Sequence, residues 1–240
     1  MTSLLYSASQ LTRSPQRPIS SKGLKALAVM TVAGLCLVLT RGLLTDNWWF
    51  FIMLVWNLCL AFFPLGVVLI VRDLRNAGFR NQWLLLGGIG AWLAFLPNSP
   101  YIITDLFHIK NIEYRLLWFD TMSLFVFAQT GLLAGLYSTL IVHRMLRPVI
   151  GTEATWATIV GSQLLSGFGI YLGRFGRWNS WDVLTKPMDL FQAIARSYED
   201  HLSVKLTLAY GFVLIVLYVA FWWYVDYDGS QSDGSNPTPQ

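Results

Sequence analysis

Long runs of apolar residues constrain this chain more than any other feature. Several reach about 18 residues, the length that a helix needs to cross a bilayer core of about 30 Å. The chain is 55% hydrophobic and only 12% charged, whereas a soluble domain carries about 25% charged residues. The sequence therefore predicts an all-α fold, a polytopic membrane helix bundle.

About six transmembrane helices account for these runs. We predict them at residues 24–40, 48–71, 82–96, 116–142, 156–172 and 206–225. Three domains follow: a disordered basic N-terminal tail at 1–23, a six-span membrane domain at 24–226 and a disordered C-terminal tail at 227–240.

A short interfacial helix is predicted at residues 187–200. There Leu190, Phe191, Ile194 and Tyr198 recur at helical spacing, which is typical of an amphipathic helix lying in the membrane interface.

Charge and cysteine content exclude several classes of function. The net charge of +4 is what a few excess Lys and Arg residues at membrane flanks produce, so it does not indicate nucleic-acid binding. The two cysteines, Cys36 and Cys59, fall inside apolar spans and are interpreted as small buried hydrophobic residues. They predict neither a disulfide nor a cysteine-based metal site.

Three features inside the spans predict helix packing. Asn57 is costly in lipid, so we expect it to face other helices and to form an interhelical hydrogen bond. Pro64 removes a backbone donor and should kink its helix. Gly131 and Gly135 form a small-residue notch that allows another segment to approach closely.

The segment after Pro97 carries the first polar cluster. We expect Ser99 to cap a helix that begins with Pro100. If that helix is an α-helix, Tyr101, Asp105 and His108 recur at i, i+4 and i+7 and share one face. Asp120 lies at the start of the following span.

The second polar cluster, Gly173–Asp182, reads GRFGRWNSWD. Long apolar segments border it, so it must lie at the membrane interface or in a hollow lined by protein. Its two tryptophans favour headgroup depth.

Six spans place the two clusters on one side of the membrane, because two crossings separate residues 97–115 from residues 174–205. Basic residues before the first span favour a cytoplasmic N-terminus, with the clusters on the extracytoplasmic side. We therefore predict a polar pocket at one membrane face, lined by Tyr101, Asp105, His108, Asp120, Arg174, Arg177, Asn179 and Asp182.

Four sequence blocks carry a family resemblance. They are Trp56-Asn57-Leu with Pro64, the run from Leu96 to His108, Trp118-Phe-Asp120, and the run from Gly167 to Asp182. They resemble the DUF1361 family of predicted bacterial membrane proteins over about residues 30–225. The resemblance implies a multi-pass protein of the bacterial plasma (inner) membrane and implies no activity.

The preferred hypothesis is an anion site. Arg174 and Arg177 suit a phosphate or carboxylate group, because guanidinium binds such groups bidentately. Asp105, His108 and Asp120 are then candidate catalytic residues or ligands of a divalent metal, as in a membrane transferase or hydrolase. The expected partners are the lipid bilayer and an anionic lipid or lipid-linked substrate, with no nucleic acid.

Two alternatives remain open. A small-solute transporter would use Asn57, Pro64, Gln129 and Gln163 along its pathway. A structural protein would instead pair Arg174 or Arg177 with Asp105, Asp120 or Asp182, and would use Asn179 and Ser180 as helix caps. The sequence leaves the substrate, cofactor, metal and oligomeric state unknown.

Overall fold

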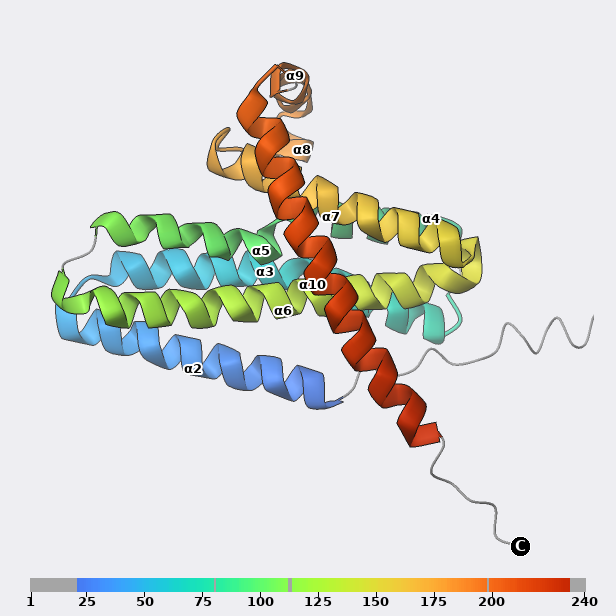
Figure 1. Ribbon diagram of the computed structural model, residues 1–240, viewed down its shortest axis with the longest axis horizontal. Helices are drawn as coiled ribbons and strands as arrows, with labels where there is room; N and C mark the ends of the chain where they lie inside the picture. Colours follow the sequence, from blue (N-terminus) through green and yellow to red (C-terminus); the bar gives the residue numbers. More distant parts are fainter. Residues whose placement is uncertain (1–20, 80, 112–113, 198, 234–240) are drawn as a thin grey trace, which may run out of the picture. The chain divides into compact units, whose positions relative to one another are not determined.

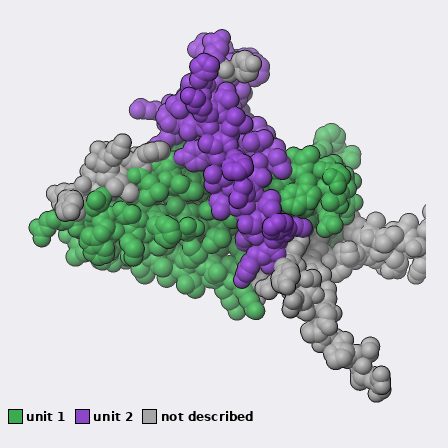
Figure 2. All heavy atoms as spheres, viewed as in Figure 1, with its two compact units in different colours: residues 1–159 green, residues 160–240 purple. Residues whose placement is uncertain are grey.

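The computed structural model describes residues 21–79, 81–111, 114–197 and 199–233, and the regular structure in these ranges is helical (Figure 1). The chain divides into two compact units, residues 1–159 and 160–240 (Figure 2). The predicted tails fall mostly outside the described residues. Helix α2 begins at Ser21 and helix α10 ends at Asp233.

Unit 1 is built around one long helix, α6. Two-thirds (67%) of its most apolar window is buried, against 28% for α2 and 39% for α3. Small residues on α6 permit this close packing, because they let neighbouring segments approach its backbone. The elements are α2 (Ser21–Thr45), α3 (Trp48–Asn76), α4 (Gln82–Phe95), α5 (Asn98–Tyr101), the 3₁₀ helices η1 (Ile102–Asn111) and η2 (Tyr114–Leu116), α6 (Leu117–Ile150) and the first part of α7 (Thr152–Arg174).

The glycine notch on α6 receives the start of α5. A Cβ added at Gly131 would lie 2.7 Å from the backbone oxygen of Ser99, and one added at Gly135 would lie 2.7 Å from the Ser99 Cβ. Both separations are too short for real Cβ contacts. The packing role predicted for these glycines is therefore confirmed.

Ser99 joins α5 to α3 rather than capping a helix. Its hydroxyl donates to the backbone oxygen of Ala61 at 2.8 Å, next to the carbonyl that Pro64 leaves without its in-helix donor. The short helix begins at Asn98 without a side-chain cap. The predicted cap is wrong because the notch draws Ser99 into the core.

The segment carrying Asp105 is a 3₁₀ helix and not an α-helix. With three residues per turn, positions 105 and 108 stand one turn apart, whereas Tyr101 closes the preceding α-helical turn. The α-helical face expected for Tyr101, Asp105 and His108 is therefore wrong. Packing of this segment against α3 and α6 overrides the local preference.

Unit 2 consists of the second part of α7, α8 (Asp182–Thr185), α9 (Pro187–Ser197) and α10 (His201–Asp233). Helices α7 and α10 touch backbone to backbone, because a Cβ at Gly167 would lie 2.6 Å from the Thr207 oxygen and 2.8 Å from the Gly211 nitrogen. The buried hydroxyls of Ser166 and Thr207 have no hydrogen-bond partner among the described atoms. Where the two backbones approach this closely, these two hydroxyls are left without hydrogen bonds to described atoms.

Four helical segments are long and apolar enough to cross a membrane: Lys22–Thr45, Trp48–Asn76, Leu117–Ile150 and His201–Val225. They indicate a membrane-embedded protein. The spans predicted at 82–96 and 156–172 fall in α4, which has only 14 residues, and in α7, which is interrupted by polar residues. A count of six is thus not confirmed and stays a prediction.

Candidate functional site

Asp120 lies in a buried ion pair at one end of unit 1. Arg41 donates to it twice, from Nε to Oδ1 at 2.8 Å and from Nη2 to Oδ2 at 3.1 Å. Arg41 also donates to the Thr45 hydroxyl and lies over the Phe50 ring at 5.8 Å. Both charged residues are buried, so this two-point contact holds α2 to α6.

Arg41 is the residue that sequence reasoning missed. The first span was expected to end at Thr40, but α2 continues to Thr45 and keeps Arg41 within its last turns. Asp120 is equally close to the start of α6. A basic and an acidic residue at matched depth, in loops predicted to share one membrane side, are the signal that could have revealed the pair.

Asp105 contacts the asparagine of the second predicted span. Asn57 Nδ2 donates to Asp105 Oδ2 at 2.7 Å, and Asp105 is 1% exposed. The expectation that Asn57 forms an interhelical hydrogen bond is confirmed. It joins α3 to η1 inside unit 1, because a polar group that is removed from water needs a partner.

The other unit 1 candidates are less defined. Tyr101 is partly buried at the end of α5, and the side chain of His108 lies outside the described part of the structure. Among the described side chains, no three His, Cys, Asp or Glu residues gather in a way that could hold a metal ion. The metal hypothesis stays a prediction.

The polar loop of unit 2 begins with a strained turn at the end of α7. Tyr171 accepts from the Phe175 N–H at 2.9 Å, and Leu172 accepts from the Trp178 N–H at 3.1 Å. Between these bonds, Arg177 adopts a φ of 57°, a left-handed conformation that glycine adopts most easily. An arginine there costs roughly 1–2 kcal/mol relative to glycine.

Asp182 folds back into the loop. Its Oδ2 accepts from the Asn179 N–H at 2.8 Å, and its Oδ1 accepts from the Thr185 hydroxyl at 3.2 Å. Helix α8 begins at Asp182 without a side-chain cap from the preceding residue. The N-cap position is therefore held by Trp181 rather than by Asn179 or Ser180, and the Asp182 carboxylate accepts from the Asn179 backbone.

The two loop arginines differ in their surroundings. Arg174, the last residue of α7, is partly buried and engaged by other groups. Arg177 is exposed, and none of the residues that the structure describes forms a hydrogen bond or ion pair with its side chain. The loop thus turns its carboxylate inward and leaves one guanidinium accessible.

A second contact closes the base of this loop. The Tyr171 hydroxyl donates to Asp200 Oδ2 at 2.6 Å, and the Leu202 N–H donates to Asp200 Oδ1 at 2.9 Å. The Tyr171 hydrogen bond, followed by that of Leu202, lowers the pKa of Asp200 below its usual 3.8. Asp200 therefore caps α10 and joins it to the end of α7.

The structure brings the candidates together only in part. Unit 1 places Asp105 against Asn57 and Asp120 against Arg41. Unit 2 places Asp182 against the Asn179 backbone. The predicted meeting of Tyr101, Asp105, His108 and Asp120 with the loop of unit 2 stays a prediction.

Comparison with known proteins gives one match. Residues 56–217 match a family model described as "Protein of unknown function (DUF1361)". The matched range includes both polar clusters and most of each unit. No curated protein and no solved structure matches the chain.

Proposed function

This chain belongs to the DUF1361 family, whose description assigns no activity, and we propose that its loop Gly173–Asp182 binds an anionic phosphate or carboxylate group at the membrane surface. The accessible, left-handed Arg177 carries the proposal. Guanidinium donates two parallel hydrogen bonds to such groups. The membrane is predicted from sequence to be the bacterial plasma membrane, with this loop on its extracytoplasmic side.

The loop's charge distribution supports anion binding. Asp182 is 8% exposed and its carboxylate accepts hydrogen bonds from the Asn179 N–H and the Thr185 hydroxyl. Among the described residues it forms no ion pair with Arg177. Trp178 is partly buried beside the arginine. An aromatic ring next to an arginine suits a site at headgroup depth.

Backbone strain at Arg177 supports a functional reason for the side chain. Glycine would relieve the strain, and in a turn without another purpose it would be the expected residue. Non-glycine residues held in this conformation are concentrated at ligand-binding sites. The φ of 57° at Arg177 therefore supports a role for its side chain.

The proposal is for binding rather than catalysis. A transferase or hydrolase would need a base beside the bound group. Asp105 and Asp120, the candidates for that role, accept hydrogen bonds from Asn57 and Arg41 within unit 1. These contacts favour a structural role for both carboxylates, and they occupy the asparagine on which the transport alternative relied.

Substitution of Arg177 tests the proposal. Native mass spectrometry of the full chain would count phosphatidylglycerol adducts, with phosphatidylcholine as the neutral reference and inorganic phosphate as a second probe. We expect Arg177→Gly and Arg177→Ala each to weaken phosphatidylglycerol binding by roughly tenfold or more, the effect of losing one charge-assisted hydrogen bond.

Two controls make the outcome decisive. Arg147→Ala removes another exposed arginine, from the last turn of α6, and should leave binding unchanged. Arg177→Gly should unfold no earlier than the natural chain, because it relieves the strained turn. Binding that survives both Arg177 substitutions overturns the proposal, as does a loss of the same size in Arg147→Ala.

A further inference from the structure

Helix α9 presents an apolar surface that no described residue of unit 2 covers. Met188 and Phe191 are 67% and 66% exposed, and Ile194 on the same side is 39% exposed. Just before the helix, Leu184 is 84% exposed. We call these four residues the apolar face.

The remaining residues of α9 form two other sectors. Asp189, Gln192 and Arg196 are exposed and polar, whereas Leu190, Ala193 and Ser197 are partly or wholly buried. A helix with one buried, one apolar and one polar exposed sector meets three environments. The sequence expectation used Leu190 and Tyr198 for the apolar side; Leu190 belongs to the partly buried sector, and Tyr198 lies outside the described residues.

The start of α10 fixes where α9 lies relative to a membrane. The candidate span begins at His201 and runs for 25 residues, about 37 Å of helix. Helix α10 continues to Asp233, but residues 226–233 are mostly polar, so the membrane-crossing part has little length beyond a bilayer core of about 30 Å and its first turn lies near the membrane surface. Three residues separate it from α9, and they reach at most about 10 Å.

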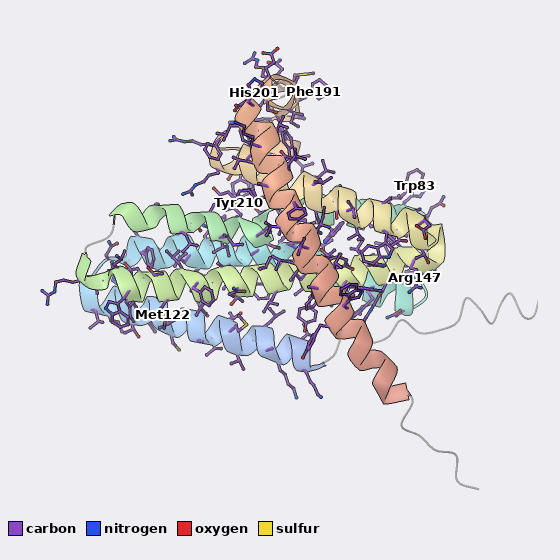
Figure 3. The ribbon with its side chains drawn as sticks, viewed as in Figure 1. Trp83, Met122, Arg147, Phe191, His201 and Tyr210 are labelled. Atoms are coloured by element: carbon purple, nitrogen blue, oxygen red, sulfur yellow. The ribbon has the colours of Figure 1, made fainter. Side chains whose placement is uncertain are left out.

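The other end of the α8–α9 segment returns to the same place. The hydrogen bond from Tyr171 to Asp200 joins the end of α7 to the residue before α10. The chain between them, which contains α8 and α9, therefore begins and ends at the same place, the junction of α7 with α10. Figure 3 shows Phe191 and His201 at the end of unit 2 where α10 begins.

We infer that α9 lies in the plane of the membrane interface, with its apolar face inserted among the lipid chains beside the entry of α10. The occupant of this face is the bilayer itself. Apolar area drives this insertion, because Asp189 and Arg196 offset each other within the helix. The helix then enters neutral and anionic bilayers alike.

This arrangement goes beyond anion binding by the loop. It places the Gly173–Asp182 loop, which is continuous with α8, at the depth of lipid headgroups. The source of the bound anion would then be a lipid headgroup rather than a free solute. The two claims are separable, since insertion of α9 needs no anion.

Spin labelling of adjacent positions tests the inference. The full chain with Cys36→Ser and Cys59→Ser would carry either Phe191→Cys or Gln192→Cys, with a nitroxide on the new cysteine. Measurements in phosphatidylcholine nanodiscs would compare relaxation by oxygen, which enriches in lipid, and by a water-soluble nickel chelate. We expect the label at 191 to be oxygen-accessible and shielded from nickel, and the label at 192 to show the reverse.

A second pair, Ile194→Cys and Arg196→Cys, should repeat the contrast one turn later. Nickel accessibility at both 191 and 192 overturns the inference, because α9 would then lie in water. Shielding of 191 from both reagents also overturns it, because protein would then cover the face, whether from unit 1 or from a second copy. Phosphatidylcholine carries no net charge, so either failure leaves the Arg177 proposal untouched.

Discussion

The charged side chains of the two units are used in opposite ways. In unit 1, Asp120 and Arg41 are both buried and satisfy each other. In the loop of unit 2, Asp182 is turned inward while Arg177 stays exposed. Charges that are removed from water must be paired, so the first arrangement joins helices, whereas the second leaves a cation available to a ligand.

The paired charges of unit 1 contribute to stability, whereas the exposed arginine of unit 2 is proposed to contribute to binding. Pairing inside unit 1 connects α2 to α6 and α3 to η1, and removal of one partner should affect folding. The Arg177 side chain forms no hydrogen bond or ion pair with the described residues, so its removal should affect binding more than stability. Three further tests, each with a control variant, examine this comparison, from the largest expected effect to the smallest.

Arg41→Ala should have the largest effect on stability. It leaves the Asp120 charge buried without its main partner, which costs about 3–5 kcal/mol. Unfolding of the purified protein in mixed detergent micelles would measure the loss. The double variant Arg41→Met with Asp120→Leu should recover most of it, because no buried charge remains.

The exposed pair Arg72–Asp73 provides a matched comparison. Its atoms approach to 2.7 Å, but Asp73 is largely exposed. Arg72→Ala should therefore cost no more than about 1 kcal/mol. If Arg41→Ala and Arg72→Ala reduce the free energy of unfolding equally, the distinction between the buried ion pair and the exposed one fails.

Asn57→Leu should have an intermediate effect. It removes the amide that donates to Asp105 while roughly preserving side-chain volume, and the loss of a donor to a buried carboxylate costs about 1–3 kcal/mol. The same unfolding assay applies. Replacing both Asn57 and Asp105 by leucine should restore stability. If the double variant is no more stable than Asn57→Leu, groups other than Asn57 satisfy the Asp105 carboxylate.

The smallest effect concerns acid stability in unit 2. The pKa of Asp200 is lowered by its hydrogen bonds from Tyr171 and Leu202. Its stabilising contribution is therefore complete above its usual pKa of 3.8 and is lost as the pH falls through the lowered value. The difference in unfolding midpoint between the natural chain and Asp200→Asn should shrink below that pH.

Tyr171→Phe serves as the control for Asp200. It deletes the donating hydroxyl but keeps the ring that stacks between Phe168 and Phe175. Part of the acid sensitivity should remain, since the Leu202 N–H still favours the charged carboxylate. An Asp200→Asn curve parallel to that of the natural chain at all pH values would exclude this role.

Sequence patterns predicted much of the packing, because some residue types admit few solutions in an apolar bundle. Gly131 and Gly135 indicated a close contact, and Asn57 indicated an interhelical hydrogen bond; both are present. Pro97 indicated the interruption between α4 and α5. In each case the local chemistry alone restricts what the chain can do.

Features that depend on tertiary packing were not predictable in this way. The 3₁₀ form of residues 102–111 follows from contacts with α3 and α6, which no local pattern encodes. Arg41 and Asp120 are separated by 79 residues, so their pairing requires the bundle to be assembled. Left-handed Arg177 runs against the preference for glycine and leaves no signal in the sequence.

The contact between Tyr171 and Asp200 bears on the order in which the protein is made. Its partners are 29 residues apart, and Gly167 touches Gly211 still further along the chain. A ribosome adds the loop arginine before it adds Asp200 and Gly211, the residues that close the loop's base and pack α10 against α7. Until those later residues emerge and insert, the nascent chain has no fixed turn in which to hold that cation.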